Sequence, residues 1–411
     1  MQVYLVGGAV RDKLLGIPHR ERDWCVVGAR PAELEAQGYQ RVGKDFPVFL
    51  HPESKQEYAL ARSERKTGPG YRGFEFISDP DISIEQDLLR RDLTINAIAE
   101  NEQGELIDPY GGQADLEARI LRHVSSAFSE DPVRVLRIAR FAARYHHLGF
   151  TIADETTDLI RQIGASGELT SLVAERVWSE MSRALDEPDP AIFFQTLRES
   201  GVLDILFPEI NALFGVPQTA KYHPEVDTGV HVMMALQKSA ELNHDNETRF
   251  AVLMHDLGKA TTPQHILPAH HGHELQGVRL VKNFCRHWRV PRTHTDLALI
   301  TTEYHSHVHR ALELKPSTLL KLFTATDVFR KPERFEKMTR ACLADLRGRL
   351  NFESAAYPQA DYLVTLGTKL READLSSVKQ SGLQGSELGE AIYKFRLGII
   401  KQYRQSLKPG D

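Results

Sequence analysis

The stretch Val3-Tyr4-Leu5-Val6-Gly7-Gly8, followed by Glu21-Arg22-Asp23-Trp24-Cys25-Val26-Val27-Gly28, decides the fold of the amino-terminal part. Each apolar run predicts a β-strand that a glycine ends. Side chains two residues apart on a strand point to the same face, so we expect Glu21 and Asp23 to project side by side. Two carboxylates this close repel each other unless a cation lies between them. The pattern therefore predicts a site for a cation such as Mg²⁺ at the start of the second strand.

The glycine pair marks a turn from the first strand into a short helix that Gly16 ends. Backbone N–H groups at Gly7 and Gly8 can approach a phosphate closely, and the start of a helix favours negative charge. Arg11 can add a guanidinium to a bound triphosphate. A tight turn in an unrelated α/β domain is the alternative, and a glycine pair alone would favour it. The acidic pair on the next strand favours phosphate binding instead.

Further motifs follow in order along the first third of the chain. They are Gly7-Gly8-Ala9-Val10-Arg11-Asp12, Glu21-Arg22-Asp23, Arg90-Arg91-Asp92-Leu93-Thr94-Ile95-Asn96-Ala97, Asp108-Pro109-Tyr110-Gly111-Gly112 and Glu130-Asp131-Pro132-Val133-Arg134-Val135-Leu136-Arg137. This series resembles the class II tRNA nucleotidyltransferases, which comprise the CCA-adding enzymes and the bacterial poly(A) polymerases. The resemblance implies an α+β protein with a polymerase-β-type α/β head, followed by an all-helical neck and body.

The resemblance also implies roles for acidic residues of the head. Glu21 and Asp23 would hold Mg²⁺ and activate the attacking hydroxyl group. The family has aspartate at the first of these positions, and because Glu21 is one methylene longer, we expect a slightly shifted metal geometry. Glu57, which begins the expected strand 57–61, is the candidate for a third carboxylate, and a solvent-facing strand residue is the alternative. Arg91 joins these residues in the implied catalytic set.

A helix is expected to begin near Asp131, with Pro132 in its first turn. Asp131 and Arg134 are neighbours on such a helix. The resemblance implies that this pair reads the Watson–Crick edge of cytosine or adenine in place of a nucleic-acid template. The implied contacts to nucleotide are Gly8, Arg11, Arg91, Asp131, Arg134, Arg137 and Arg140. A solvated stripe of salt bridges is the alternative for the arginines.

Histidine and aspartate are concentrated between residues 223 and 345. Imidazole and carboxylate groups together suit a divalent ion such as Ni²⁺, Co²⁺, Mn²⁺ or Zn²⁺. His255-Asp256 ends an apolar helix, and His231 lies in an expected helix upstream. This pattern resembles the HD phosphohydrolases, which are all-helical. The resemblance implies the metal ligands His231, His255, Asp256 and Asp345, and a metal-activated water that attacks phosphorus.

The other histidines of this region are weaker candidates. His270, His271 and His273 are expected in a loop near the site, where they could contact phosphate rather than metal. His305 is followed by Ser306 and therefore does not form a second His-Asp pair. A buried or solvated structural role is the alternative for each histidine alone.

Length and composition limit the architecture and the location. At 411 residues the chain is too long for one typical domain. We expect a nucleotidyltransferase head at 1–122, a helical neck and body at 123–222, an HD domain at 223–345 and a helical tail at 346–411. Three scattered cysteines indicate a reducing compartment and no apolar stretch is long enough to span a membrane, so we expect a cytoplasmic protein.

The resemblance implies an enzyme that adds C, C and A to the 3′ end of tRNA from CTP and ATP. It implies Mg²⁺ in the head and Ni²⁺ or another transition divalent ion in the HD domain. That domain would hydrolyse phosphomonoesters, 2′-nucleotides and 2′,3′-cyclic phosphates. A poly(A) polymerase with the same head, and an HD hydrolase controlled by a nucleotide-sensing head, are the alternatives. A monomer and a homodimer both stay open.

Overall fold

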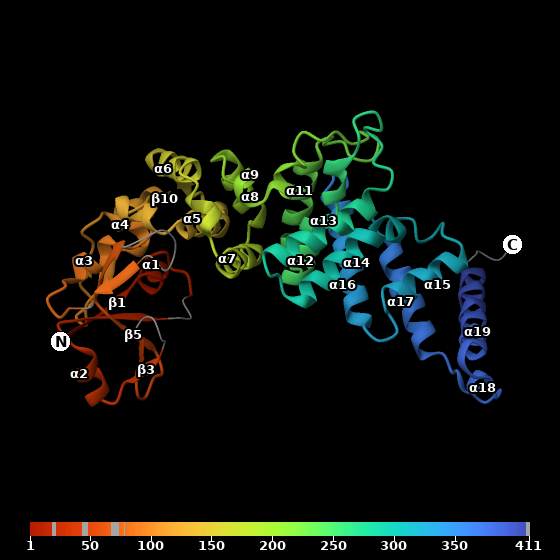
Figure 1. Cartoon of the computed structure of the whole chain (residues 1–411), viewed down its shortest axis with the longest axis horizontal. Helices are drawn as coiled ribbons and strands as arrows, with labels where there is room; N and C mark the ends of the chain where they lie inside the picture. The colour runs from red at the N-terminus through yellow and green to blue at the C-terminus, as the bar shows by residue number, and fades with distance from the viewer. Residues whose placement is uncertain (19–21, 43–47, 67–73, 78, 408–411) are drawn as a thin grey trace. The chain divides into compact units, whose positions relative to one another are not determined.

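The computed structural model describes residues 1–18, 22–42, 48–66, 74–77 and 79–407 (Figure 1). The chain divides into two compact units, Met1–Leu206 and Phe207–Asp411. The finer division into four parts stays a prediction. Glu21, the first residue of the expected acidic pair, lies outside the described residues, so the structure does not test its place.

The first unit contains a seven-stranded sheet with the order β3-β4-β5-β2-β1-β8-β9. The strands are β1 (Gln2–Val6), β2 (Asp23–Val27), β3 (Gln40–Val42), β4 (Val48–Leu50), β5 (Glu57–Leu60), β8 (Ala99–Glu100) and β9 (Leu106–Ile107). Two small pairs accompany it: β6 (Ser63–Lys66) is antiparallel to β7 (Phe74–Ile77), and β10 (Ile120–Leu121) is parallel to β11 (Thr151–Ile152). The two strands that the opening sequence predicts are therefore confirmed as β1 and β2.

Strand β2 determines the position of the acidic side chains. It runs antiparallel to β1, with Val6 opposite Asp23, and parallel to β5, with Asp23 opposite Glu57. Because residues in register on adjacent strands point to the same face of a sheet, Asp23 and Glu57 lie side by side. The strand that Glu57 was expected to begin is confirmed as β5.

The centre of the sheet is buried on both faces. Cys25 packs in one apolar cluster with Tyr4 and Val6, whereas its neighbour Val26 packs in another with Leu34. Alternate residues of a strand point to opposite faces, so this separation follows from the pleat.

The helices of the unit, together with short 3-10 helices labelled η, are α1 (Gly8–Leu14), α2 (Pro31–Ala36), α3 (Ile84–Leu89), η2 (Thr94–Asn96), α4 (Gly112–Ala118), η3 (Ser126–Glu130), α5 (Val133–Tyr145), η4 (His146–Leu148), α6 (Asp154–Ala165), η5 (Glu168–Ser171), α7 (Ala174–Asp186), α8 (Pro190–Glu199) and α9 (Leu203–Leu206).

In the described part of the second unit every regular element is a helix. These are α10 (Pro208–Asn211), α11 (Thr228–Glu241), α12 (Asn246–Met254), η6 (Leu257–Thr261), α13 (His273–His287), α14 (Arg292–His309), α15 (Pro316–Ala325), α16 (Pro332–Arg347), α17 (Pro358–Glu372), α18 (Ser376–Lys379) and α19 (Gly385–Ser406). Among the residues that the structure covers, no helix is both long enough and apolar enough to cross a lipid bilayer.

Side-chain caps determine where two helices of this unit begin. Asp227 accepts the backbone N–H of Val230 at the start of α11, and Asp245 accepts that of Thr248 at the start of α12. Each cap satisfies a donor that the first turn leaves unpaired. The two starts place His231 in the first turn of α11 and His255 directly after the last residue of α12.

Gly112, the first residue of α4, offers a test of the packing in the first unit. A Cβ there would lie 2.3 Å from the carbonyl oxygen of Thr94 and 2.7 Å from Cγ1 of Ile98. We expect Gly112→Ala to lower the free energy of unfolding by about 1–3 kcal/mol, because backbone and core would have to shift. Urea denaturation measures the change.

Gly164 in α6 is the matched control. The nearest atom to a Cβ there is Cγ2 of Val202 at 3.4 Å, an ordinary contact distance. Gly164→Ala should therefore leave stability unchanged or raise it by about 0.5–1 kcal/mol, since alanine favours the helix. Equal losses in the two variants would contradict the packing described for Gly112.

Candidate active sites

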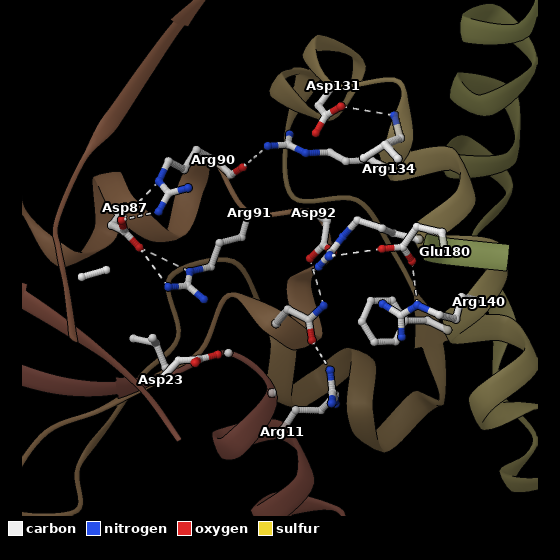
Figure 2. A pocket seen from close by; sticks show the side chains of 18 of the residues that line it. Arg11, Asp23, Asp87, Arg90, Arg91, Asp92, Asp131, Arg134, Arg140 and Glu180 are labelled. Carbon is white, nitrogen blue, oxygen red and sulfur yellow. Dashed lines mark hydrogen bonds and ion pairs between the residues drawn. The ribbon is translucent and has the colours of Figure 1, made fainter. Parts of the chain in front are cut away.

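A cavity of about 840 Å³ in the first unit collects charged residues that are distant in sequence (Figure 2). Ten of the residues that line it are arginines, and six are aspartates or glutamates. This excess of guanidinium groups suits a polyanion such as a triphosphate. The cavity brings together the expected residues Gly8, Arg11, Asp23, Glu57, Arg91, Asp131, Arg134, Arg137 and Arg140.

Asp23 and Glu57 form the acidic corner of this cavity. Both side chains are exposed, and they lie in register on the parallel strands β2 and β5. Carboxylate oxygens are the ligands that hard divalent cations prefer. The adjacent, accessible carboxylates therefore fit a divalent ion that arrives with a charged substrate.

The glycine turn allows an arginine to lie against it. Gly7 has φ +68°, and a Cβ at this position would lie 2.8 Å from a terminal nitrogen of Arg91. Any other residue would be strained in this conformation and would displace the guanidinium. Gly7 therefore brings the backbone of the turn and the Arg91 cation to the same wall of the cavity.

A buried carboxylate orients Arg91 and its neighbour. Figure 2 shows Arg90 and Arg91 reaching Asp87, with terminal nitrogens 2.8 and 3.1 Å from its two oxygens. Burial alone would raise the pKa of Asp87, but the guanidinium groups of Arg91 and Arg90 lower it. The sequence analysis did not identify Asp87, although its spacing of three and four residues from the arginines was the available signal.

Two more carboxylates position arginines of helix α5. Asp92 lies 2.7 Å from a terminal nitrogen of Arg137, and Glu180 on α7 accepts Nε–H of Arg140 at 2.7 Å. Burial would raise the pKa of Asp92, but Arg137 and the Asn96 amide hold that pKa well below its usual range. Glu180 was missed because 40 residues separate it from Arg140, and only the packing of α7 on α5 joins them.

The expected base-reading pair has other partners in this structure. Arg134 donates to the backbone oxygens of Ala127 and Arg90 at 2.6 and 2.7 Å. Arg176 donates to both carboxylate oxygens of Asp131 at 3.0 and 2.7 Å. Both residues of the pair line the cavity, while their role in base selection stays a prediction. Arg176 is a further residue that the sequence analysis missed.

Arg11 is more enclosed than the sequence suggested. Its side chain is 4% exposed, and its Nε–H donates to Asp12 at 2.8 Å. Another nitrogen contacts Asn96, and the guanidinium lies 5.2 Å from the ring centre of Phe141. These contacts hold Arg11 in one orientation at the wall of the cavity.

The second unit brings together three of the four expected HD ligands. His231 in α11, His255 after α12 and Asp345 in α16 have ligand atoms within 4.8 Å of one another, and all three are buried. His231 Nε2 lies 3.0 Å from an oxygen of Asp345, and His255 Nε2 lies 3.8 Å from the other. Burial would lower the pKa of His255, but Asp256 and Asp345 raise it.

The fourth expected ligand, Asp256, falls in a different group. Its ligand atoms lie within 4.8 Å of those of His273 and His305. His273 was expected in a loop, and that expectation was wrong: it is the first residue of helix α13. Asp256 Oδ1 and His255 Nε2 are buried without a hydrogen bond. A carboxylate oxygen and an imidazole nitrogen in this condition fit a divalent cation, which could pair with both.

Comparisons with known proteins match segments of both units. Family models match residues 3–122 as a "Poly A polymerase head domain", residues 149–214 as a "Probable RNA and SrmB- binding site of polymerase A" and residues 228–331 as an "HD domain". The crystal structure of a Bacillus stearothermophilus CCA-adding enzyme in complex with CTP shares the fold. It has a TM-score of 0.65 and 24% identity, and the match covers 98% of this chain and 89% of that one.

Two relatives match over nearly their whole length. The "Multifunctional CCA protein" of Thioalkalivibrio sulfidiphilus is 57% identical over 98% of this chain and 99% of its own. The protein of the same name from Teredinibacter turnerae is 56% identical over 100% of both chains. The chain therefore belongs to the family of multifunctional CCA proteins.

Proposed function

We propose that the first unit of this chain adds C, C and A to the 3′ end of tRNA from CTP and ATP, with release of pyrophosphate. The observation that carries the proposal is the single cavity in which the acidic corner, Asp23 and Glu57, faces a wall of arginines. Its charges suit a metal-bound triphosphate, and family membership narrows the reaction to the tRNA end. Three buried free cysteines support a reducing location, for which we propose the cytoplasm.

The acidic corner would hold Mg²⁺, with Glu21 as an additional ligand. When bound, Mg²⁺ promotes loss of the proton from the attacking 3′-hydroxyl and balances the charge of the leaving pyrophosphate. Arg91, Arg137 and Arg140 would bind the phosphates. Because Asp87, Asp92 and Glu180 already hold these arginines in position, little side-chain freedom would be lost when the nucleotide binds.

Asp131 and Arg134 would select C or A over U and G. Their carboxylate acceptor and guanidinium donors complement amino groups and ring nitrogens of these bases. A good bidentate pairing discriminates between bases by about 1–3 kcal/mol. For this, each side chain has to exchange part of its present contacts with Arg176 or the backbone for contacts with the base.

The second unit would hydrolyse phosphomonoesters, 2′-nucleotides and 2′,3′-cyclic phosphates with Ni²⁺ or another transition divalent ion. Mixed imidazole and carboxylate ligands support this type of ion, and when bound it activates water as the nucleophile. Such a reaction has a direct use for the first unit. A tRNA end that carries a phosphate lacks the hydroxyl group needed for addition, and its removal would restore that group.

The most informative assay incubates the protein with labelled CTP, ATP, Mg²⁺ and a tRNA that lacks its CCA end. We expect three added nucleotides in the order C, C, A, resolved by gel electrophoresis. A long tail of A would favour the poly(A) polymerase alternative. No incorporation would favour the nucleotide-sensing alternative.

Removal of the charge at Asp23 tests the acidic corner. We expect Asp23→Asn to reduce CCA addition by about 100-fold or more, since a neutral amide no longer attracts the metal ion. Phosphatase activity of the same preparation should persist, which would show that the second unit is intact, and circular dichroism would show that the first unit is still folded. Glu53→Gln, at an exposed carboxylate that does not line the cavity, is the control and should retain addition.

Loss of the His255 imidazole tests the separation of the two activities. We expect His255→Ala to abolish hydrolysis of 2′,3′-cyclic nucleotides and to leave CCA addition nearly unchanged, because His255 lies in the second unit. Parallel assays on one preparation measure both. Equal loss of both activities would rule out independent sites.

A further inference from the structure

Helix α7 presents two oppositely charged side chains to helix α5 at the wall of the cavity in the first unit. Arg176 and Glu180 are four residues apart, so they lie on the same face of α7. Arg176 donates to Asp131, two residues before α5 begins, whereas Glu180 accepts from Arg140 further along α5 (Figure 2). All four residues line the cavity. The function proposed above gives roles to Asp131 and Arg140 but none to Arg176.

Arg176 holds Asp131 at two points. Nη1 of Arg176 lies 3.0 Å from Oδ1 of Asp131, and Nη2 lies 2.7 Å from Oδ2. Because the guanidinium and the carboxylate are both planar, two parallel hydrogen bonds fix the direction and the plane of the carboxylate. A single hydrogen bond would leave the carboxylate able to rotate about its last side-chain bond. Arg176 therefore determines which way the oxygens of Asp131 face.

Stabilisation of the two helices accounts poorly for this contact. The side chains of Arg176 and Asp131 are 27% and 22% exposed, and an ion pair this accessible adds little to stability. The buried pair Glu180 and Arg140 already joins α7 to α5. Orientation of the Asp131 carboxylate is the better explanation for a two-point contact in the cavity wall.

Orientation of this carboxylate matters because the four bases differ in one group at their edge. Cytosine and adenine carry an amino group where uracil and guanine carry a carbonyl oxygen. A carboxylate held against this group accepts a hydrogen bond from the amino group and repels the carbonyl oxygen. If the carboxylate could turn away, it would no longer exclude uracil and guanine. Base selection by Asp131 therefore depends on how rigidly its side chain is held.

We propose that Arg176 is a positioning residue that determines base selection through Asp131. One of its two hydrogen bonds would be exchanged for the amino group of C or A, and the other would keep the carboxylate in place. Arg134 has a separate support, because the backbone oxygens of Ala127 and Arg90 hold its guanidinium. This inference deepens the CCA addition proposed above and rests on it for its substrates.

Substitution of Arg176 tests the proposal through kcat/KM for CTP and UTP on tRNA that lacks its CCA end, and for ATP and GTP on tRNA that ends in CC. We expect Arg176→Gln to lower the preferences for C over U and for A over G by about 10-fold, within the range for one good bidentate contact. Arg176→Lys should also lower both preferences, because an ammonium group does not form the two parallel bonds. Loosened helix packing would instead lower kcat/KM for all four nucleotides alike.

Arg183→Gln is the matched control. Arg183 lies seven residues further along α7, lines the same cavity and is exposed. Its substitution removes the same charge from the cavity but leaves both hydrogen bonds from Arg176 to Asp131 in place. Both preferences should therefore stay unchanged in this variant.

A double-mutant cycle shows whether Arg176 acts through Asp131. In a chain that carries Asp131→Ala, Arg176→Gln should change the two preferences no further. Unchanged preferences in either Arg176 variant that circular dichroism shows to be folded, or an equal loss with and without Asp131, would overturn the proposal and leave CCA addition standing. Failure of the unsubstituted chain to add C and A would remove the proposed function itself.

Discussion

The register of strand β2 governs the chemistry of the first unit. Asp23 lies opposite Val6 on β1, directly before the glycine turn, and opposite Glu57 on β5. A slip of one residue would turn every side chain of β2 to the other face of the sheet. It would turn Asp23 and Cys25 together to the other face and separate Asp23 from Glu57 and from the cavity. The apolar packing of Cys25 on one face and Val26 on the other therefore also specifies the acidic corner.

Buried carboxylates act in both units as partners that hold cationic groups in position. Asp87, Asp92 and Glu180 orient arginines in the first unit, and Arg349 lies 3.0 Å from the buried Asp345 in the second. A buried ion pair adds little to stability compared with apolar packing, because both charges lose their hydration. We infer that these ion pairs hold the charged side chains in fixed positions. A bound phosphate then contacts arginines that need little reorganisation.

Local chemistry explains why much of this could be predicted from the sequence. Strand β2, the glycine turn, helix α5 and the end of α12 each depend on residues within one short segment, and each was expected at or near its observed position. Residues from distant segments that contact the site could not be predicted from the sequence in this way. Glu180 and Arg176 have no signal near Arg140 or Asp131, since the packing of α7 on α5 alone makes them neighbours.

The sequence by itself determined the type of fold, the family and nine residues that line one cavity, because motif order and local hydrophobic patterns persist without knowledge of packing. Only the tertiary structure decided how the histidines of the second unit are grouped. His273 and His305 lie on different helices, and neither belongs to a His-Asp pair in the sequence. Helix packing brings their Nε2 atoms to within 3.6 Å of Asp256 Oδ1, although no local pattern in the sequence indicates that the three residues meet.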